Sequence, residues 1–123
     1  DIRNIYSLTG VLESYGVEVL HAETGRDGIA LLELNPDIDV ALIDIMMPEM
    51  DGYETMRQIR AQPITADVPL IAVTAKAMKG DRQKCLDAGA SDYIAKPVDI
   101  ELLLALLRVA LARSTDRMPI GEA

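Results

Sequence analysis

The chain has 123 residues, of which 50% are hydrophobic and 26% charged, a composition that suits one soluble domain with a buried core. Its formal net charge of −8 disfavours nucleic acid as a direct partner. No apolar run reaches the roughly 20 residues of a membrane-spanning helix, so we expect no membrane contact. A single cysteine suits a reducing cytosol, so we expect a cytoplasmic domain. The lone cysteine (Cys85) and lone histidine (His21) exclude an internal disulfide, a Ser-His-Asp triad and a His-rich metal site.

Helical and strand-like patterns then alternate along the chain. Apolar residues recur at helical spacing before Gly16, and a second helical pattern ends at Asn35-Pro36. Asp51-Gly52 opens a third helix, Gly89 ends a fourth, and Asp99 can cap a long, leucine-rich last helix. We expect helices over about residues 1–15, 27–34, 51–62, 78–88 and 99–113, and strands over about residues 16–22, 39–44, 69–75 and 92–97.

The expected strands over residues 39–44 and 69–75 are apolar almost throughout, which is typical of strands buried on both faces. Their alternation with helices predicts an α/β fold, a doubly wound parallel sheet covered on both sides. The chain opens on a helix, whereas such a domain normally opens on a strand near the sheet centre. We therefore expect an apolar first strand upstream of Asp1, and four strands within the sequence itself.

Polar side chains stand at the carboxyl ends of three expected strands, where doubly wound sheets bind ligands. These are the carboxylate of Asp44, the hydroxyl of Thr74 and the ammonium of Lys96. Each alone has a structural explanation: a helix cap, an ordinary β-branched strand residue and a lysine reaching to solvent. Three at neighbouring strand ends favour a functional site.

This combination suits phosphoryl transfer to a carboxylate. An aspartate can act as a nucleophile, while a lysine and a threonine hold oxygens of the transferred group. A divalent cation would neutralise the remaining charge, and ligands that are carboxylates and a backbone carbonyl favour Mg²⁺. One carboxylate is too few for that cation, so a second acidic group is expected on the strand upstream of Asp1.

Three motifs in this order, DIMMPEMDG from Asp44, VTA from Val73 and DYIAKP from Asp92, resemble the receiver domain of two-component response regulators. The resemblance covers residues 1–113 and is greatest to the receivers of hybrid sensor histidine kinases. It implies a flavodoxin-like fold with strand order 2-1-3-4-5, whose first strand is missing from this sequence. Residues 114–123 contain turn formers without periodicity, and we expect a tail or linker there.

The resemblance also implies a role for each matching residue. Asp44 would be the phosphoacceptor, Thr74 and Lys96 would bind the phosphoryl group, and Tyr93 would be the aromatic residue that changes rotamer on activation. Asp44 and the Met46 carbonyl would bind Mg²⁺ together with an acidic pair that lies just before Asp1. Pro97 would support a cis peptide bond after the lysine.

The function that the resemblance implies is that of a phosphorelay switch. A histidine kinase or phosphotransfer protein would pass a phosphoryl group from phosphohistidine to Asp44, and the surface of the fourth helix, last strand and last helix would change its partner preference. The domain would not be an enzyme in its own right. Two alternatives stay open: a phosphatase with an aspartyl-phosphate intermediate, for which Asp51 would be the second acid, and an interaction module that is never phosphorylated.

The last helix carries more leucine than one buried face requires. We expect one face to pack on the sheet and the nearly opposite face to form a partner or homodimer surface. The alternative is that the segment 118–120 folds over the second face. The sheet-facing set is Leu102, Leu103, Leu106, Val109 and Ala110, and the interface set is Leu104, Leu107 and Leu111.

Two residues flank the expected site, each two positions beyond a site residue. Met46 follows Asp44 and Lys76 follows Thr74. Side chains there could control the access of water to an acyl phosphate and so its lifetime. The alternative is that Met46 contributes only its backbone and that Lys76 is solvated.

Overall fold

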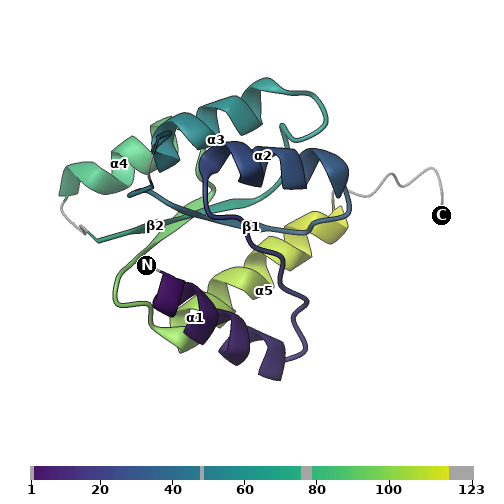
Figure 1. The fold of residues 1–123 in the computed structure, drawn as a ribbon, viewed down its shortest axis with the longest axis vertical. Coiled ribbons are helices and arrows are strands. Elements are labelled where there is room, and N and C mark those ends of the chain that lie inside the picture. The colour runs from purple at the N-terminus through teal and green to yellow at the C-terminus, as the bar shows by residue number, and fades with distance from the viewer. Residues whose placement is uncertain (1, 48, 76–78, 117–123) are drawn as a thin grey trace.

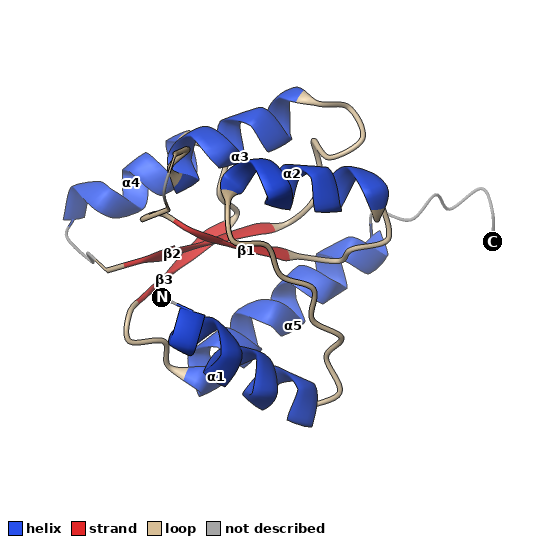
Figure 2. Ribbon diagram, viewed as in Figure 1, coloured by secondary structure: helices blue, strands red, loops and turns tan. Residues whose placement is uncertain are grey.

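A computed structural model describes residues 2–47, 49–75 and 79–116. A parallel sheet lies between two layers of helices, with α2, α3 and α4 on one face and α1 and α5 on the other (Figures 1 and 2). The elements in chain order are α1 (Ile2–Ser14), α2 (Gly25–Leu34), β1 (Ala41–Asp44), α3 (Gly52–Ala61), β2 (Leu70–Thr74), α4 (Lys79–Asp87), β3 (Asp92–Ala95) and α5 (Ile100–Asp116). The predicted α/β fold is confirmed.

Local signals in the sequence set the ends of the helices. The side chains of Thr24, Asp51 and Asp99 each accept a hydrogen bond from a backbone N–H in the first turn of α2, α3 and α5, respectively. These bonds satisfy donors that have no partner within the helix. After α1 and α4 the chain turns at Gly16 and Gly89, with φ of 83° and 115°, a conformation that suits glycine.

Within the described residues the sheet has three parallel strands in the order β1-β2-β3. The central strand β2 is buried at every position, as its apolar sequence predicts. The register places Asp44 opposite Val73 and Thr74 opposite Ala95, so the strands end at nearly the same level. This arrangement matches the last three strands of the expected order, and the position of the strand expected upstream of Asp1 stays a prediction.

The expected strand over residues 16–22 is wrong for this structure, because the segment has no regular secondary structure and pairs with no strand in the described part of the chain. The alternation that led to the prediction is present: Val17 and Val19 are half-buried, while Glu18 and Leu20 are exposed. Alternation sets only which side chains face the core. A strand also needs a neighbour whose backbone accepts and donates its hydrogen bonds.

The core consists of two aliphatic clusters, one on each face of the sheet. Alternate residues of β2 serve the two faces: Leu70 and Ala72 pack beneath α2, α3 and α4, whereas Ile71 and Val73 pack against α1 and α5. Period-two alternation explains this division. Because the sequence contains no Phe or Trp, branched aliphatic side chains and a fully buried methionine, Met56, fill the core.

The prediction for the last helix is right for part of its buried face and wrong for the rest: Leu103 and Ala110 are buried as expected, and Leu106 is partly buried. Leu107, expected on an exposed face, is only 6% exposed, whereas Leu102 and Val109, expected on the sheet, are 49% and 52% exposed. The buried face of α5 is centred on Leu103, Leu107 and Ala110, with Leu104 and Leu106 partly buried beside them and Leu111 still 42% exposed. The reason is that α5 packs against the sheet and also into the cluster that contains Leu12 of α1.

The bounds of α5 also differ from the prediction at the end of the chain. The helix continues past Arg113 to Asp116, and the expected contact of residues 118–120 lies outside the described residues. Among the helices that the structure describes, none has both the length and the apolar character to cross a bilayer.

Candidate functional site

The structure brings two of the three strand-end residues into direct contact and places the third beside them. Asp44 is the last residue of β1 and Lys96 directly follows β3, and the Lys96 ammonium donates a hydrogen bond to Asp44 Oδ2 at 2.8 Å. Thr74, the last residue of β2, lies on the strand between them and is 4% exposed. The predicted cluster at the sheet edge is therefore confirmed as an arrangement in space.

Backbone hydrogen bonds extend one residue beyond the strands and hold this edge in place. The N–H of Ile45 donates to the Val73 carbonyl at 3.0 Å, and the N–H of Lys96 donates to the Thr74 carbonyl at 2.7 Å. Asp44 and Lys96 are thereby anchored at fixed heights on opposite sides of β2. The separation of their side chains follows from the register of the sheet.

The turn after Asp44 folds the chain back against the strand end. The N–H of Met46 donates to Asp44 Oδ1 at 2.9 Å, and the N–H of Gly52 donates to the Ile45 carbonyl at 3.0 Å. A Cβ on Gly52 would lie 2.6 Å from both the Asp44 carbonyl oxygen and the Ile45 Cα. Only glycine permits this approach. The sequence signal Asp51-Gly52 predicted a turn but not this contact.

The Asp44–Lys96 pair is about one-third exposed, with side-chain exposures of 31% and 28%. A pair so open to solvent contributes little to stability, because water screens it. The chemical consequence of the pair is larger, because the Lys96 ammonium lies within hydrogen-bond distance of one oxygen of Asp44 and the backbone N–H of Met46 within that of the other. An incoming anionic group at Asp44 would thus meet a positive charge.

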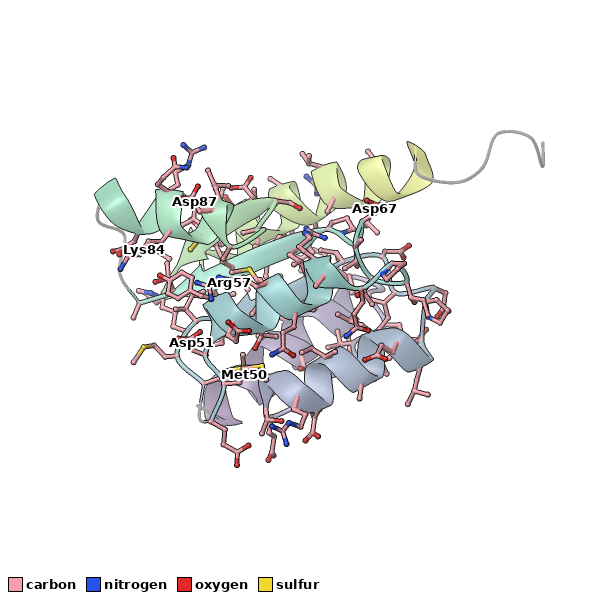
Figure 3. All side chains as sticks on the ribbon, turned by 90° about the horizontal axis from the view of Figure 1, so that it is seen from above. Met50, Asp51, Arg57, Asp67, Lys84 and Asp87 are labelled. Atoms are coloured by element: carbon pink, nitrogen blue, oxygen red, sulfur yellow. The ribbon has the colours of Figure 1, made fainter. Side chains whose placement is uncertain are left out.

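Two other side chains that could take part in chemistry, those of Asp51 and Cys85, have structural roles instead. Asp51 lies at the start of α3, next to Met50 (Figure 3), and its Oδ1 accepts the first-turn N–H of Glu54 at 2.9 Å, so it serves as the helix cap that its sequence context favoured. Burial, together with the nearby Asp81 carboxylate, raises the pKa of the Cys85 thiol, so Cys85 remains a neutral, buried thiol that is unsuited to act as a nucleophile.

The described residues do not complete a metal site. They contain no group of three or more His, Cys, Asp or Glu side chains able to hold an ion. Asp44 supplies a carboxylate at the sheet edge, but its oxygens already accept hydrogen bonds from Lys96 and Met46. The acidic pair expected before Asp1 thus remains a requirement of the predicted magnesium site.

The other residues assigned from the sequence are placed as follows. Tyr93 lies in β3 and is half-buried against the core cluster beneath α2, α3 and α4. The bond between Lys96 and Pro97 is cis, as predicted. Lys76 lies outside the described residues. The Met46 side chain is 74% exposed.

Comparison with known proteins agrees with this arrangement. The profile of the response regulator receiver domain matches residues 1–108. Protein PilH of Pseudomonas aeruginosa is 42% identical over 108 residues, which cover 88% of each chain. The transcriptional regulator RpaA of Synechocystis is 40% identical over 88% of this chain, which spans only 44% of that protein.

A comparison with a solved structure concerns the fold. The receiver domain of a sensor histidine kinase from P. aeruginosa, with a magnesium ion coordinated in its active-site cleft, is 36% identical and has a TM-score of 0.83 over 91% of each chain. The similarity thus extends over the sheet edge that carries Asp44, Thr74 and Lys96. The chain belongs to the family of response regulator receiver domains.

Proposed function

We propose that Asp44 accepts a phosphoryl group from a phosphohistidine donor, held by a histidine kinase or a phosphotransfer protein. The observation that carries the proposal is the 2.8 Å contact between the Asp44 carboxylate and the Lys96 ammonium at the carboxyl edge of the sheet. Membership of the receiver family supports the same assignment.

Each residue of the site has a separate role in the phosphoryl transfer. A carboxylate oxygen of Asp44 attacks phosphorus, the bond from phosphorus to the donor's imidazole nitrogen breaks, and the imidazole leaves with the bonding electrons and takes up a proton. The Lys96 ammonium and the Thr74 hydroxyl offer hydrogen bonds to the phosphoryl oxygens, where charge is concentrated. The Met46 N–H holds the carboxylate in a defined orientation.

The proposal includes a magnesium ion, which needs more ligands than the described residues provide. Asp44 and the Met46 carbonyl would contribute oxygen ligands, and acidic groups would complete the site. The first helix begins at the same edge of the molecule, where the strands end (Figure 1). Residues just before α1 would therefore be close enough to supply them. When bound, the ion would offset the negative charge of the transferred group.

We further propose that the domain is a cytoplasmic switch rather than an enzyme. New charge at Asp44 would favour one of two conformations of Thr74 and Tyr93, and the surface of α4, β3 and α5 would change with them. Tyr93 supports this proposal, because it pairs in register with Ala72 on the strand that ends at Thr74.

The test is phosphorylation of the protein, together with any residues that naturally precede Asp1, by a small phosphodonor in the presence of Mg²⁺. Intact mass should show one phosphoryl addition that Asp44→Asn abolishes. Asp51→Asn is the matched control and should still be phosphorylated, since asparagine caps a helix as well as aspartate does. Loss of labelling in both variants, or in neither, would remove Asp44 as the acceptor.

A receiver-like interaction module that is never phosphorylated is the second candidate. It is favoured by the incomplete set of metal ligands among the described residues. The same experiment separates the two functions, because the module predicts a folded protein that takes up no phosphoryl group at any Mg²⁺ concentration.

A further inference from the structure

The side chain next but one to Asp44 is an unusually accessible methionine. Met46 is 74% exposed. The other methionines that the structure describes are shielded: Met47 and Met50 pack partly buried against the core, and Met56 is fully buried. The sulfur of Met50 lies against Gly25 of α2. Within the described residues, Met46 is thus the methionine most open to solutes.

We propose that Met46 is a site of reversible oxidation by peroxides, and that its sulfoxide shortens the lifetime of a phosphoryl group on Asp44. The second half of the proposal rests on the phosphoacceptor function proposed above. The first half concerns only the thioether and stands on its exposure.

The oxidation step is a two-electron transfer of oxygen. A lone pair on the Met46 sulfur attacks one oxygen of hydrogen peroxide, the O–O bond breaks, and the second oxygen leaves as water after proton transfer. Sulfur is oxidised and peroxide is reduced, so no further reactant is needed. A thiol-dependent sulfoxide reductase would reverse the change.

The position of Met46 connects this chemistry to Asp44. Its backbone N–H donates to Asp44 Oδ1 at 2.9 Å, so its Cα is held next to the carboxylate. A methionine side chain is long and unbranched, and can reach over neighbouring atoms. The Asp44 carboxylate is itself 31% exposed, so both side chains are open to solvent at this edge of the sheet.

Oxidation would change the polarity of that edge without changing its charge. A thioether is a weak hydrogen-bond acceptor and excludes water from the surface it covers. A sulfoxide is polar and accepts hydrogen bonds strongly. It would hold water beside the acyl phosphate, where water is the reactant that removes the phosphoryl group. We therefore expect faster phosphoryl loss from the oxidised protein.

The first experiment measures where oxidation occurs. Met78 and Met118, which lie outside the described residues, are replaced with leucine in the protein and in all variants. The protein is then treated with limiting hydrogen peroxide, and sulfoxide at each remaining methionine is followed by fragment-ion mass spectrometry. Met46 should be oxidised at least about tenfold faster than Met56, with Met47 and Met50 slower than Met46. Equal rates at Met46 and Met50 would overturn the modification site.

The second experiment measures the phosphoryl-loss rate before and after peroxide treatment. Oxidation should raise this rate about threefold or more in the parent and in Met50→Leu, and leave it unchanged in Met46→Leu, whose aliphatic side chain cannot be oxidised. Met46→Gln, which adds an acceptor oxygen without oxidation, should lose phosphate faster than Met46→Leu. Reductase treatment should restore the original rate in the parent.

The outcomes keep the two proposals apart. An unphosphorylated Asp44 in the reduced parent would refute the phosphoacceptor function and the lifetime effect with it, while the order of oxidation would still decide the modification site. Phosphorylation with equal loss rates before and after oxidation would refute the lifetime effect and leave the phosphoacceptor function standing.

Discussion

At the scale of single residues, Gly52 determines how closely the loop after Asp44 can return to its own strand. Its N–H binds the Ile45 carbonyl, and the space that a Cβ would need is already filled by backbone atoms of Asp44 and Ile45. Backbone cannot rotate aside as a flexible side chain can. Any larger residue must displace the strand end that carries Asp44.

Gly52→Ala should therefore destabilise the protein by about 1–3 kcal/mol, as overpacking of a closed site does, and should slow phosphorylation of Asp44. Gly80→Ala is the matched control: a Cβ there meets nothing within 4 Å, and Gly80 lies in the exposed part of α4. It should be neutral or stabilise by up to about 1 kcal/mol. Urea unfolding measures both, and equal effects of the two substitutions would contradict the argument.

At the scale of elements, α5 shows why a helical wheel leaves the orientation of an apolar helix open. Leucine occurs on several sides of this helix, so several buried faces are compatible with the sequence. The actual face is selected by two neighbours at once, the sheet and α1, which meet α5 in one cluster. Leu107 consequently lies in the core, and a polar residue at this position would report on folding rather than on an interface.

Leu107→Ala should cost about 2–5 kcal/mol, because it opens a cavity beneath α5. Leu102→Ala removes the same atoms from the same helix at a position that is 49% exposed, and should change the stability by less than about 0.5 kcal/mol. The free energy of unfolding in urea distinguishes the two. A larger loss in Leu102→Ala than in Leu107→Ala would mean that Leu102 lies in the core and Leu107 on the surface, as the wheel first indicated.

At the scale of the whole molecule, Arg60 ties segments that are far apart in the sequence. Its guanidinium donates to the carbonyls of Ala66 and Val68 in the loop before β2, and to that of Gly89 before β3. It also reaches Ser91 Oγ at 3.4 Å, an atom that accepts the N–H of Leu70. One side chain of α3 thus fixes the entry of two strands whose far ends carry Thr74 and Lys96.

Arg60→Ala should lower the free energy of unfolding by about 3 kcal/mol, because several half-buried carbonyls lose a charged donor together. Arg57→Ala is the control on the same helix. Arg57 is exposed and pairs only with Glu54 among the described contacts, so its loss should cost less than about 0.5 kcal/mol. Equal unfolding midpoints for the two variants would show that the Arg60 contacts are not coupled to the fold.

The sequence by itself determined what depends on local chemistry and on period. Caps and glycine stops set the helix ends, uninterrupted apolar runs marked β1 and β2, and the residues at strand ends pointed to Asp44, Thr74 and Lys96. These predictions succeeded because a parallel sheet aligns the carboxyl ends of its strands whatever its details are.

Only the tertiary structure decided what depends on neighbours. Residues 16–22 alternate like a strand but have no pairing partner among the described residues. Helix α5 buries Leu107, which its wheel placed on the outer face, and exposes Leu102 and Val109, which the wheel placed on the sheet. The close approach of Gly52 to Asp44 and Ile45 depends on how the loop folds back on its own strand, and the exposure of Met46 depends on its position in that loop. Period sets which residues share a face, whereas packing and hydrogen-bond partners decide which face is covered.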